Sequence, residues 1–182
     1  DSGSEIKIYD KATSFKTVYS DDEVLIIYKP KGIASEGLNS VESIIRENNG
    51  NLILCHRLDT NTDGLLMFAR NERAYNEILN GFKNKYISKF YKAKAYGVMQ
   101  NDIVYKVYHN KVAGSVEIVT ECNVVGADGN TTVLDIKIYS GKTHQIRAQL
   151  ASHGHFILGD SKYGRDDINR KYGYKKQQLT AY

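Results

Sequence analysis

Residues 54–70 read LCHRLDTNTDGLLMFAR, and the interpretation of the whole chain depends on this stretch. An apolar run ends at Cys55, and a second apolar run begins at Leu65. Between them, a polar turn follows three closely spaced ionisable side chains, His56, Arg57 and Asp59. The pattern predicts two buried strands joined by a charged turn. Charges flanked by buried strands must be paired or desolvated and often mark a functional site, although a hairpin with a surface ion pair fits the composition equally well.

The same stretch resembles the HRLDxxTSGLLxxAK signature of the RluA family of pseudouridine synthases. The aspartate of HRLD is the catalytic residue in that family, and it corresponds to Asp59 here. The resemblance implies an enzyme that isomerises uridine in structured RNA, with ribosomal RNA as the first expectation and transfer RNA as the second. It also implies an α+β fold, with a mixed, mainly antiparallel sheet, flanking helices and a central cleft. No metal or other cofactor is expected.

Length and composition agree with a globular protein that binds nucleic acid. The 182 residues suffice for one domain with a sizeable core, and the formal net charge of +4 fits an RNA partner without requiring one. No apolar run approaches the roughly 20 residues that a membrane span needs. The two cysteines, Cys55 and Cys122, lie far apart in the sequence, so we expect a reducing cytoplasm. We also expect a monomer.

The two ends of the chain carry separate expectations. Residues 4–9 alternate as a strand, and a polar link follows as far as residue 14. The strand resembles the last strand of an S4-like RNA-binding domain, so residues 1–14 are interpreted as a remnant of such a domain. The catalytic domain would then comprise residues 15–182. The final residues, QQLTAY, resemble the beginning of the family's closing strand, which implies an incomplete C-terminus.

Periodicity predicts the regular elements between these ends. Residues 24–28 form a β-branched run typical of a central strand, and residues 131–139 alternate as another strand. A helix is expected over 39–49, with Asn39 or Ser40 as its cap, and a second helix over 72–83 after Asn71. Residues 101–125 suggest several short strands, broken by glycine at positions 114 and 126.

Residues 89–97, KFYKAKAYG, alternate strictly and predict a strand with two different faces. Tyr91 lies on the face opposite Phe90 and Lys92. A tyrosine in a strand is ordinarily a core residue. However, the segment resembles the family's KxYxAxVxG strand, whose tyrosine lies in the active site, and this implies a catalytic role for Tyr91.

Residues 140–164 resemble the family's TGRxHQIRxHLxxxGxPIxGDxxYG block. The arginine of HQIR pairs with the catalytic carboxylate in the family, which implies that Arg147 pairs with Asp59. Three positions depart from the pattern: Lys142 replaces arginine, Gln149 replaces histidine, and Asp63 replaces serine at its place in the first motif. Lys142 keeps its charge but loses the bidentate fork of arginine. A helix is expected over 144–153, capped by Thr143.

Together these residues suggest a chemistry for the site. An arginine within about 4–6 Å lowers the pKa of an aspartate, so Arg147 would keep Asp59 ionised. Tyr91 could stack on the uracil and act on its carbon 5 proton. Candidate RNA-binding residues are Arg57, His56, Lys29, Lys89 and Lys142, with Lys31 and Lys92 as further rim lysines.

Several alternatives remain open from the sequence. Lys29 is equally compatible with a turn lysine beside a proline, and His56 with a side chain that satisfies a backbone carbonyl. A metal site at His144, His153 and His155 lacks paired cysteines or an HExxH spacing. Two other functions compete with the synthase: a non-catalytic RNA-binding module that retains the fold, and a hydrolase that uses Asp59 with Asp160.

Overall fold

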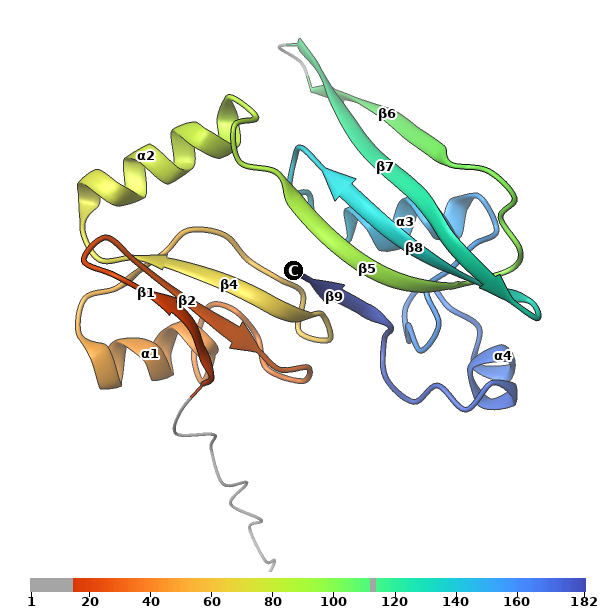
Figure 1. The fold of residues 1–182 in the computed structure, drawn as a ribbon, viewed down its shortest axis with the longest axis horizontal. Coiled ribbons are helices and arrows are strands. Elements are labelled where there is room, and N and C mark those ends of the chain that lie inside the picture. Colours follow the sequence, from red (N-terminus) through yellow and green to blue (C-terminus); the bar gives the residue numbers. More distant parts are fainter. Residues whose placement is uncertain (1–14, 112–113) are drawn as a thin grey trace, which may run out of the picture.

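One mixed sheet organises the described residues, 15–111 and 114–182, of the computed structural model (Figure 1). Its spatial order is β1-β2-β4-β9-β5-β8-β7-β6, with β3 paired to β4, and the one parallel pair among the described strands is β4 with β9. The strands are β1 (Thr17–Ser20), β2 (Val24–Lys29), β3 (Ile53–Leu54), β4 (Asp63–Ala69), β5 (Lys89–Tyr96), β6 (Ile103–Lys111), β7 (Gly114–Asp128), β8 (Thr131–Ile138) and β9 (Leu179–Ala181). The predicted mixed, mainly antiparallel α+β fold is confirmed. The strand predicted over residues 4–9 and the linker after it lie outside the described residues.

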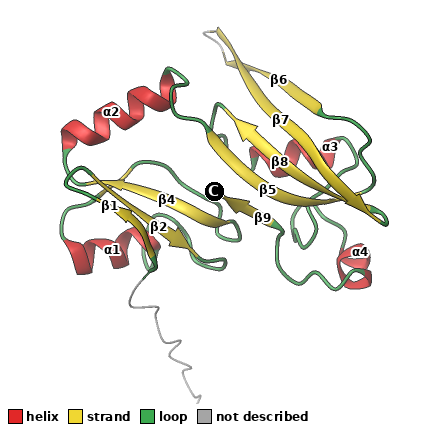
Figure 2. Ribbon diagram, in the orientation of Figure 1, coloured by secondary structure: helices red, strands yellow, loops and turns green. Residues whose placement is uncertain are grey.

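Four helices flank this sheet in the described part of the chain (Figure 2). They are α1 (Val41–Asn49), α2 (Glu72–Lys83), α3 (Gln145–Ser152) and α4 (Asp166–Lys171). The predicted caps of the first two are present, because Ser40 forms a capping box with Ser43 and the Asn71 side chain accepts the N–H of Ala74.

The first two helices cover opposite faces of β4. Phe68 packs in the main core, which also contains Val41 of α1. Its neighbour Met67 packs against a second cluster, which contains Ala74 and Ile78 of α2. Because successive strand residues point to opposite faces, α1 and α2 lie on the two sides of the sheet.

Two predictions of local structure are wrong. The described part of residues 101–125 holds no series of short strands; β6 and β7 are long and pair with each other from Ile103 opposite Cys122 to Lys111 opposite Gly114. The register between β7 and β8 shifts between Val124 and Gly126, so the chain has a bulge at Val125, next to this glycine, rather than a break. Helix α3 is not capped by Thr143; its N-cap is His144, which is in the left-handed conformation and makes no side-chain capping bond.

A close approach of two strands fixes the centre of the sheet. Asp63 and Gly64 of β4 lie beside Thr180 and Ala181 of β9. A Cβ atom at Gly64 would lie 2.0 Å from the carbonyl oxygen of Ala181, and the φ of Gly64 is +121°. Glycine is therefore required at this position. Strand β9 therefore lies directly beside β4 (Figure 1). The turn that carries Asp59 immediately precedes this end of β4.

Both cysteines, Cys55 and Cys122, are free and buried. Across residues 15–111 and 114–182, the helices are too short or too polar to cross a bilayer.

Candidate active site

A pocket of about 270 Å³ opens over the central strands of the sheet. The segment 55–59 lines one side of the pocket, and the segment 141–147 lines the other. Tyr91 of β5, Ile138 of β8 and Leu179 of β9 contribute from the sheet, and Leu79 and Phe82 contribute from α2. The pocket is the central cleft that the sequence predicted, and Asp59, Tyr91 and Arg147 all line it.

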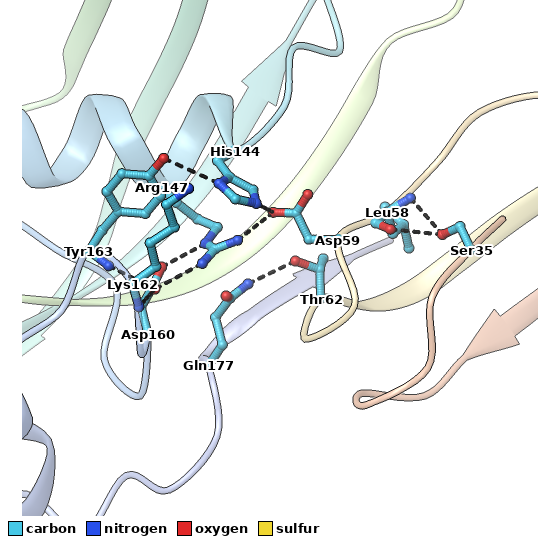
Figure 3. A network of polar contacts seen from close by, with 10 residues as sticks. All are labelled: Ser35, Leu58, Asp59, Thr62, His144, Arg147, Asp160, Lys162, Tyr163 and Gln177. Carbon is cyan, nitrogen blue, oxygen red and sulfur yellow. Dashed lines mark hydrogen bonds and ion pairs between the residues drawn. The ribbon is translucent and has the colours of Figure 1, made fainter. Parts of the chain in front are cut away.

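Asp59 and Arg147 form an ion pair inside this pocket (Figure 3). Arg147 Nη1 donates to Asp59 Oδ2 at 2.8 Å, across 88 positions of sequence. The Arg147 side chain is 8% exposed and that of Asp59 is 19% exposed. The other oxygen, Asp59 Oδ1, receives no hydrogen bond from the described residues. One oxygen of the carboxylate is thus anchored, and the second remains available to a bound molecule.

A second carboxylate, Asp160, binds the side of the Arg147 guanidinium that does not contact Asp59. Arg147 Nε donates to Asp160 Oδ2 at 2.7 Å, and Nη2 donates to Oδ1 at 2.9 Å. Asp160 is fully buried, and its Oδ1 also accepts the backbone N–H groups of Lys162 and Tyr163. This bidentate geometry orients the guanidinium, so its remaining Nη1 points to Asp59.

The electrostatics of this pair have opposing causes. Burial disfavours the charge of Arg147, but hydrogen bonds to Asp160 and Asp59 outweigh that effect and raise the pKa of Arg147 above its usual value. Burial likewise tends to raise the pKa of Asp160, while its hydrogen bonds from Arg147 and the backbone lower it on balance. Asp160 is therefore a buried anion with both oxygens engaged. It does not provide the second acid that the hydrolase interpretation needs.

Buried polar side chains hold the turn that carries Asp59. Ser35 Oγ donates to the carbonyl of Leu58 at 2.8 Å and accepts the N–H of Leu58 at 2.9 Å. Beyond Asp59, Gln177 Nε2 donates to Thr62 Oγ1 at 2.8 Å. Ser35, Thr62 and Gln177 are all buried. The residue before Asp59 and the turn after it are therefore both fixed to other parts of the fold.

Tyr91 lies on β5 with its side chain 6% exposed in the pocket. It pairs with Ile136 of β8 on one side and Ala181 of β9 on the other. Burial first, and the nearby Asp59 carboxylate second, raise the pKa of the Tyr91 phenol. The hydroxyl is therefore a neutral phenol at physiological pH.

Comparison with known proteins adds an independent observation to this geometry. A family model described as RNA pseudouridylate synthase matches residues 23–152. The chain belongs to this family. It is 31% identical over 186 residues to ribosomal large subunit pseudouridine synthase C of Rickettsia conorii, with 91% of this chain and 61% of that protein covered. It is 28% identical to the dual-specificity RNA pseudouridine synthase RluA of Vibrio vulnificus, with 82% of this chain and 69% of that protein covered.

A solved structure agrees with the pseudouridylate synthase fold. Human RNA pseudouridylate synthase domain containing 1 superposes with a TM-score of 0.78 at 21% identity, over 93% of this chain and 77% of the human chain. The present chain spans 61% of the length of the Rickettsia relative.

Lys29, a candidate for contact with RNA, is occupied by contacts within the fold. Its side chain is fully buried, and Nζ donates to the carbonyls of Pro30 at 2.9 Å, Ile33 at 2.8 Å and Thr60 at 3.1 Å. Burial lowers the pKa of Lys29 to about 8, against the pull of nearby carboxylates. The ammonium ties the residue after Asp59 to the Lys29 turn, so the alternative of a structural turn lysine is the better description.

His56 is also occupied by the fold. Its Nε2 accepts the backbone N–H of Met67 at 3.3 Å, and its ring meets Phe82 edge-on with centroids 5.8 Å apart. Its Nδ1 is buried without a hydrogen bond in the described structure. Burial foremost, with Lys89 adding to it, lowers the pKa of His56 to about 4. The ring is neutral and packed, and it accepts a backbone N–H where the sequence suggested a contact with RNA or a backbone carbonyl.

Four of the five predicted RNA-binding residues line the pocket: His56, and also Arg57, Lys89 and Lys142. Arg57 is exposed and forms a surface ion pair with Glu36. Lys89 is partly buried, its ammonium lies 4.3 Å from the centre of the Phe82 ring, and burial lowers its pKa. Neither Lys89 nor Lys142 has a carboxylate partner among the described residues. Their contact with RNA remains a prediction that the geometry permits.

The two further rim lysines point elsewhere. Lys31 lies 3.6 Å from a carboxylate oxygen of Asp63. Lys92 lies 3.6 Å from Asp135, on the face of β5 that is opposite Tyr91. Neither lysine lines the pocket.

The histidines considered as metal ligands have other surroundings. His144 Nδ1 lies 3.2 Å from the hydroxyl of Tyr163, and His155 Nδ1 lies 3.1 Å from the carbonyl of Tyr96. Throughout 15–111 and 114–182, no three histidine, cysteine or acidic side chains gather in a way that would hold a metal ion.

Sequence reasoning missed several residues that hold this site. Asp160 and Tyr163 belong to the GDxxYG part of the recognised block, but the sequence suggested Asp160 only as the second acid of a hydrolase and gave Tyr163 no role. Ser35 and Gln177 carry no such signal, because each is a common polar residue whose partner lies 23 and 115 positions away.

Proposed function

We propose that this chain is the catalytic domain of an RNA pseudouridine synthase, with Asp59 as its catalytic carboxylate. The observation that carries the proposal is the Asp59 carboxylate itself. One oxygen is held by Arg147, and the other receives no hydrogen bond in a pocket that also contains Tyr91. Ribosomal RNA is the first substrate to test and transfer RNA the second. The relatives support this order, since one is named for the ribosomal large subunit and another for dual specificity.

The reaction is an isomerisation in which atoms balance without a cofactor. The bond between ribose C1′ and uracil N1 breaks, the uracil turns, and a bond between C1′ and C5 replaces it. The proton on C5 is lost, and N1 gains one. Asp59 Oδ1 is the oxygen that would act, whether at ribose C1′, at uracil C6 or on a ribose proton. Arg147 would stabilise the carboxylate in each case.

Tyr91 is the group proposed to meet the base. Its buried ring offers a stacking surface, and its hydroxyl enters the reaction as a neutral phenol because its pKa is raised. A phenol can receive the C5 proton only while it passes on its own, so Tyr91 would act as a relay rather than as a resident base.

The target uridine has to leave its stack to reach this pocket, as in other enzymes that modify bases. Arg57, Lys89 and Lys142 surround the pocket and would contact the displaced nucleotide or its phosphates. We propose that the protein acts as a monomer in the cytoplasm, where its RNA substrates are found; size-exclusion chromatography with light scattering tests the oligomeric state.

Release of tritium from RNA labelled at uracil C5 tests the activity directly. We expect the protein to release tritium from ribosomal RNA, with transfer RNA as a parallel substrate. The Asp59→Asn variant, which keeps the shape of the side chain, should release none and still bind the RNA. Asp22→Asn is the matched control, because Asp22 is an exposed carboxylate outside the pocket.

The same experiment separates the synthase from its main competitor. A protein that binds RNA but releases no tritium from either substrate would be a non-catalytic RNA-binding module. Equal tritium release by the unsubstituted protein and by Asp59→Asn would show that a different group performs the chemistry.

A further inference from the structure

His144 is a second group that faces Asp59. Its Nε2 lies 3.9 Å from Asp59 Oδ2, the same oxygen that Arg147 binds (Figure 3). Its other nitrogen, Nδ1, lies 3.2 Å from the hydroxyl of Tyr163, and the two rings meet edge to face with centroids 5.6 Å apart. The ring therefore lies between a tyrosine hydroxyl and the proposed catalytic carboxylate.

Two series of contacts thus connect Asp59 with the turn that contains Asp160 and Tyr163. Asp160 holds Arg147, and Arg147 binds Asp59 Oδ2. Tyr163 donates its backbone N–H to Asp160 and places its hydroxyl at His144. The ring of Tyr163 also lies 5.3 Å from the guanidinium carbon of Arg147. The turn that fixes Arg147 therefore fixes the orientation of His144 as well.

The backbone of His144 departs from the helix that it precedes. Its φ of 55° and ψ of 22° are left-handed, and its side chain makes no capping bond to α3. A residue with a Cβ atom adopts this conformation at a cost in free energy, although histidine and asparagine tolerate it better than most. Such strain persists where the surroundings impose it, and it is concentrated at functional sites. Here the strained residue directs its ring to Asp59 instead of capping the helix.

The tyrosine hydroxyl determines which tautomer suits this position. A neutral imidazole carries one proton, on Nδ1 or on Nε2. If Tyr163 donates its hydroxyl proton to Nδ1, the proton of the ring must be on Nε2, and this N–H faces Asp59. Burial lowers the pKa of His144, Arg147 and Lys162 act in the same direction, and Asp59 and Asp160 oppose them. The balance favours the neutral ring that this tautomer requires.

We propose that His144 and Tyr163 are positioning residues for Asp59. Tyr163 holds the proton of His144 on Nε2. This N–H moves to hydrogen-bond distance of Asp59 Oδ2 when RNA fills the pocket. Asp59 Oδ2 then has two donors, Arg147 and His144, and Oδ1 alone is left for the reaction. The separation of 3.9 Å is too long for a hydrogen bond in the free protein, and catalytic contacts commonly tighten on substrate binding. The inference rests on the proposed synthase function for its kinetic consequence.

The tautomer is measurable without any activity. Nitrogen-15 NMR of the protein labelled in histidine distinguishes protonated from unprotonated ring nitrogens, and the signals lost in His144→Asn assign His144. We expect Nε2 protonated and Nδ1 unprotonated near neutral pH, and a shift toward the Nδ1-protonated form in Tyr163→Phe. An Nδ1-protonated or doubly protonated ring in the unsubstituted protein would overturn the proposal, and so would a spectrum that Tyr163→Phe leaves unchanged.

Kinetics with labelled ribosomal RNA supply the second measurement. Removing one hydrogen bond that strengthens at the reacting carboxylate should lower kcat about tenfold. We expect this loss in both Tyr163→Phe and His144→Asn, with little change in KM; asparagine also accepts the left-handed backbone, so folding should be preserved, as thermal melting will verify. Tyr172→Phe is the control, because Tyr172 lies outside the pocket.

The outcomes separate this inference from the proposed function. An unchanged kcat in both variants, or a rise in KM alone, would overturn the positioning role while the synthase activity stands. A folded, unsubstituted protein that releases no tritium would refute the proposed function instead, and the NMR result would still decide whether Tyr163 sets the tautomer of His144.

Discussion

Two aspartates flank Arg147, and the structure treats them in opposite ways. Asp160 is fully buried, and both of its oxygens accept hydrogen bonds from Arg147, with two backbone N–H groups in addition. Asp59 is 19% exposed and has one oxygen bound. The same guanidinium thus binds one carboxylate whose two oxygens both accept hydrogen bonds and another that has one oxygen free. Pairing with arginine therefore does not distinguish the two acids; the oxygen left free inside the pocket is what supports Asp59 as the proposed reactive acid.

Substitution of Asp59 should produce the largest effect on turnover. In Asp59→Asn, the amide oxygen can still accept from Arg147, but the charged oxygen in the pocket is lost. We expect kcat to fall by at least about a thousandfold, since the loss of a reacting group commonly costs more than that. The free energy of unfolding should change by less than about 1 kcal/mol, because the pair is partly exposed. Single-turnover tritium release and urea unfolding measure the two effects.

Substitution of Asp160, unlike that of Asp59, should lower the free energy of unfolding substantially. Asp160→Asn leaves the buried Arg147 without its bidentate partner and presents an amide N–H₂ to the guanidinium. Breaking a buried ion pair in this way costs about 3–5 kcal/mol. We therefore expect a clear loss of stability in urea unfolding, with Asp22→Asn as the control. If Asp160→Asn were as stable as the unsubstituted protein while Asp59→Asn unfolded readily, the contrast between the two carboxylates would be wrong.

Lys29 extends the comparison to a buried cation near the same turn. Its ammonium donates to three carbonyls, one of them that of Thr60, the residue after Asp59. Lys29→Met leaves these acceptors without their donor, and we expect a loss of about 2 kcal/mol in the free energy of unfolding. Turnover should fall as well, since the turn is no longer tied. Lys16→Met, at an exposed lysine, provides the baseline for both measurements.

The sequence predicted the pairing of the proposed reacting groups better than it predicted the residues that support them. The pairing of Asp59 with Arg147 followed from two recognised motifs, and the caps Ser40 and Asn71 followed from local hydrogen-bonding rules. The burial of Lys29 was not predicted, because a lysine is almost never fully buried and the three carbonyls that permit it come together only in the folded chain.

The left-handed backbone of His144 escaped prediction for a related reason. Local rules favoured Thr143 as a helix cap, but contacts from distant segments decided the conformation. Similarly, the glycines at 114 and 126 suggested broken strands, whereas pairing along the whole of β7 kept the strand continuous with a bulge. Tertiary contacts outweighed local propensity in each case.

His56 offers a smaller test, on a group that the fold keeps neutral. Its pKa is lowered from 6.5 to about 4, chiefly by burial. Below pH 6.5 the unfolded chain therefore takes up a proton that the folded chain takes up only near pH 4, so acid favours unfolding. We expect stability to fall as the pH decreases through this window. His56→Gln, which can still accept the N–H of Met67, should flatten that part of the profile in urea unfolding; an equally steep profile would show that other groups cause it.

The smallest effect on RNA binding is expected at the rim of the pocket, where the positive charge of Lys142 would offset the negative charge of the carboxylates. Asp59 and Asp160 share one guanidinium, so these three groups together carry one net negative charge. Lys142 lines the pocket without a carboxylate partner among the described residues and would offset this charge. Lys142→Gln should weaken RNA binding a few-fold and reduce the slope of log Kd against log salt by about one. Lys31→Gln, at a lysine paired with Asp63 outside the pocket, should leave the slope unchanged. Equal losses in the two variants would place the RNA contact elsewhere on the surface.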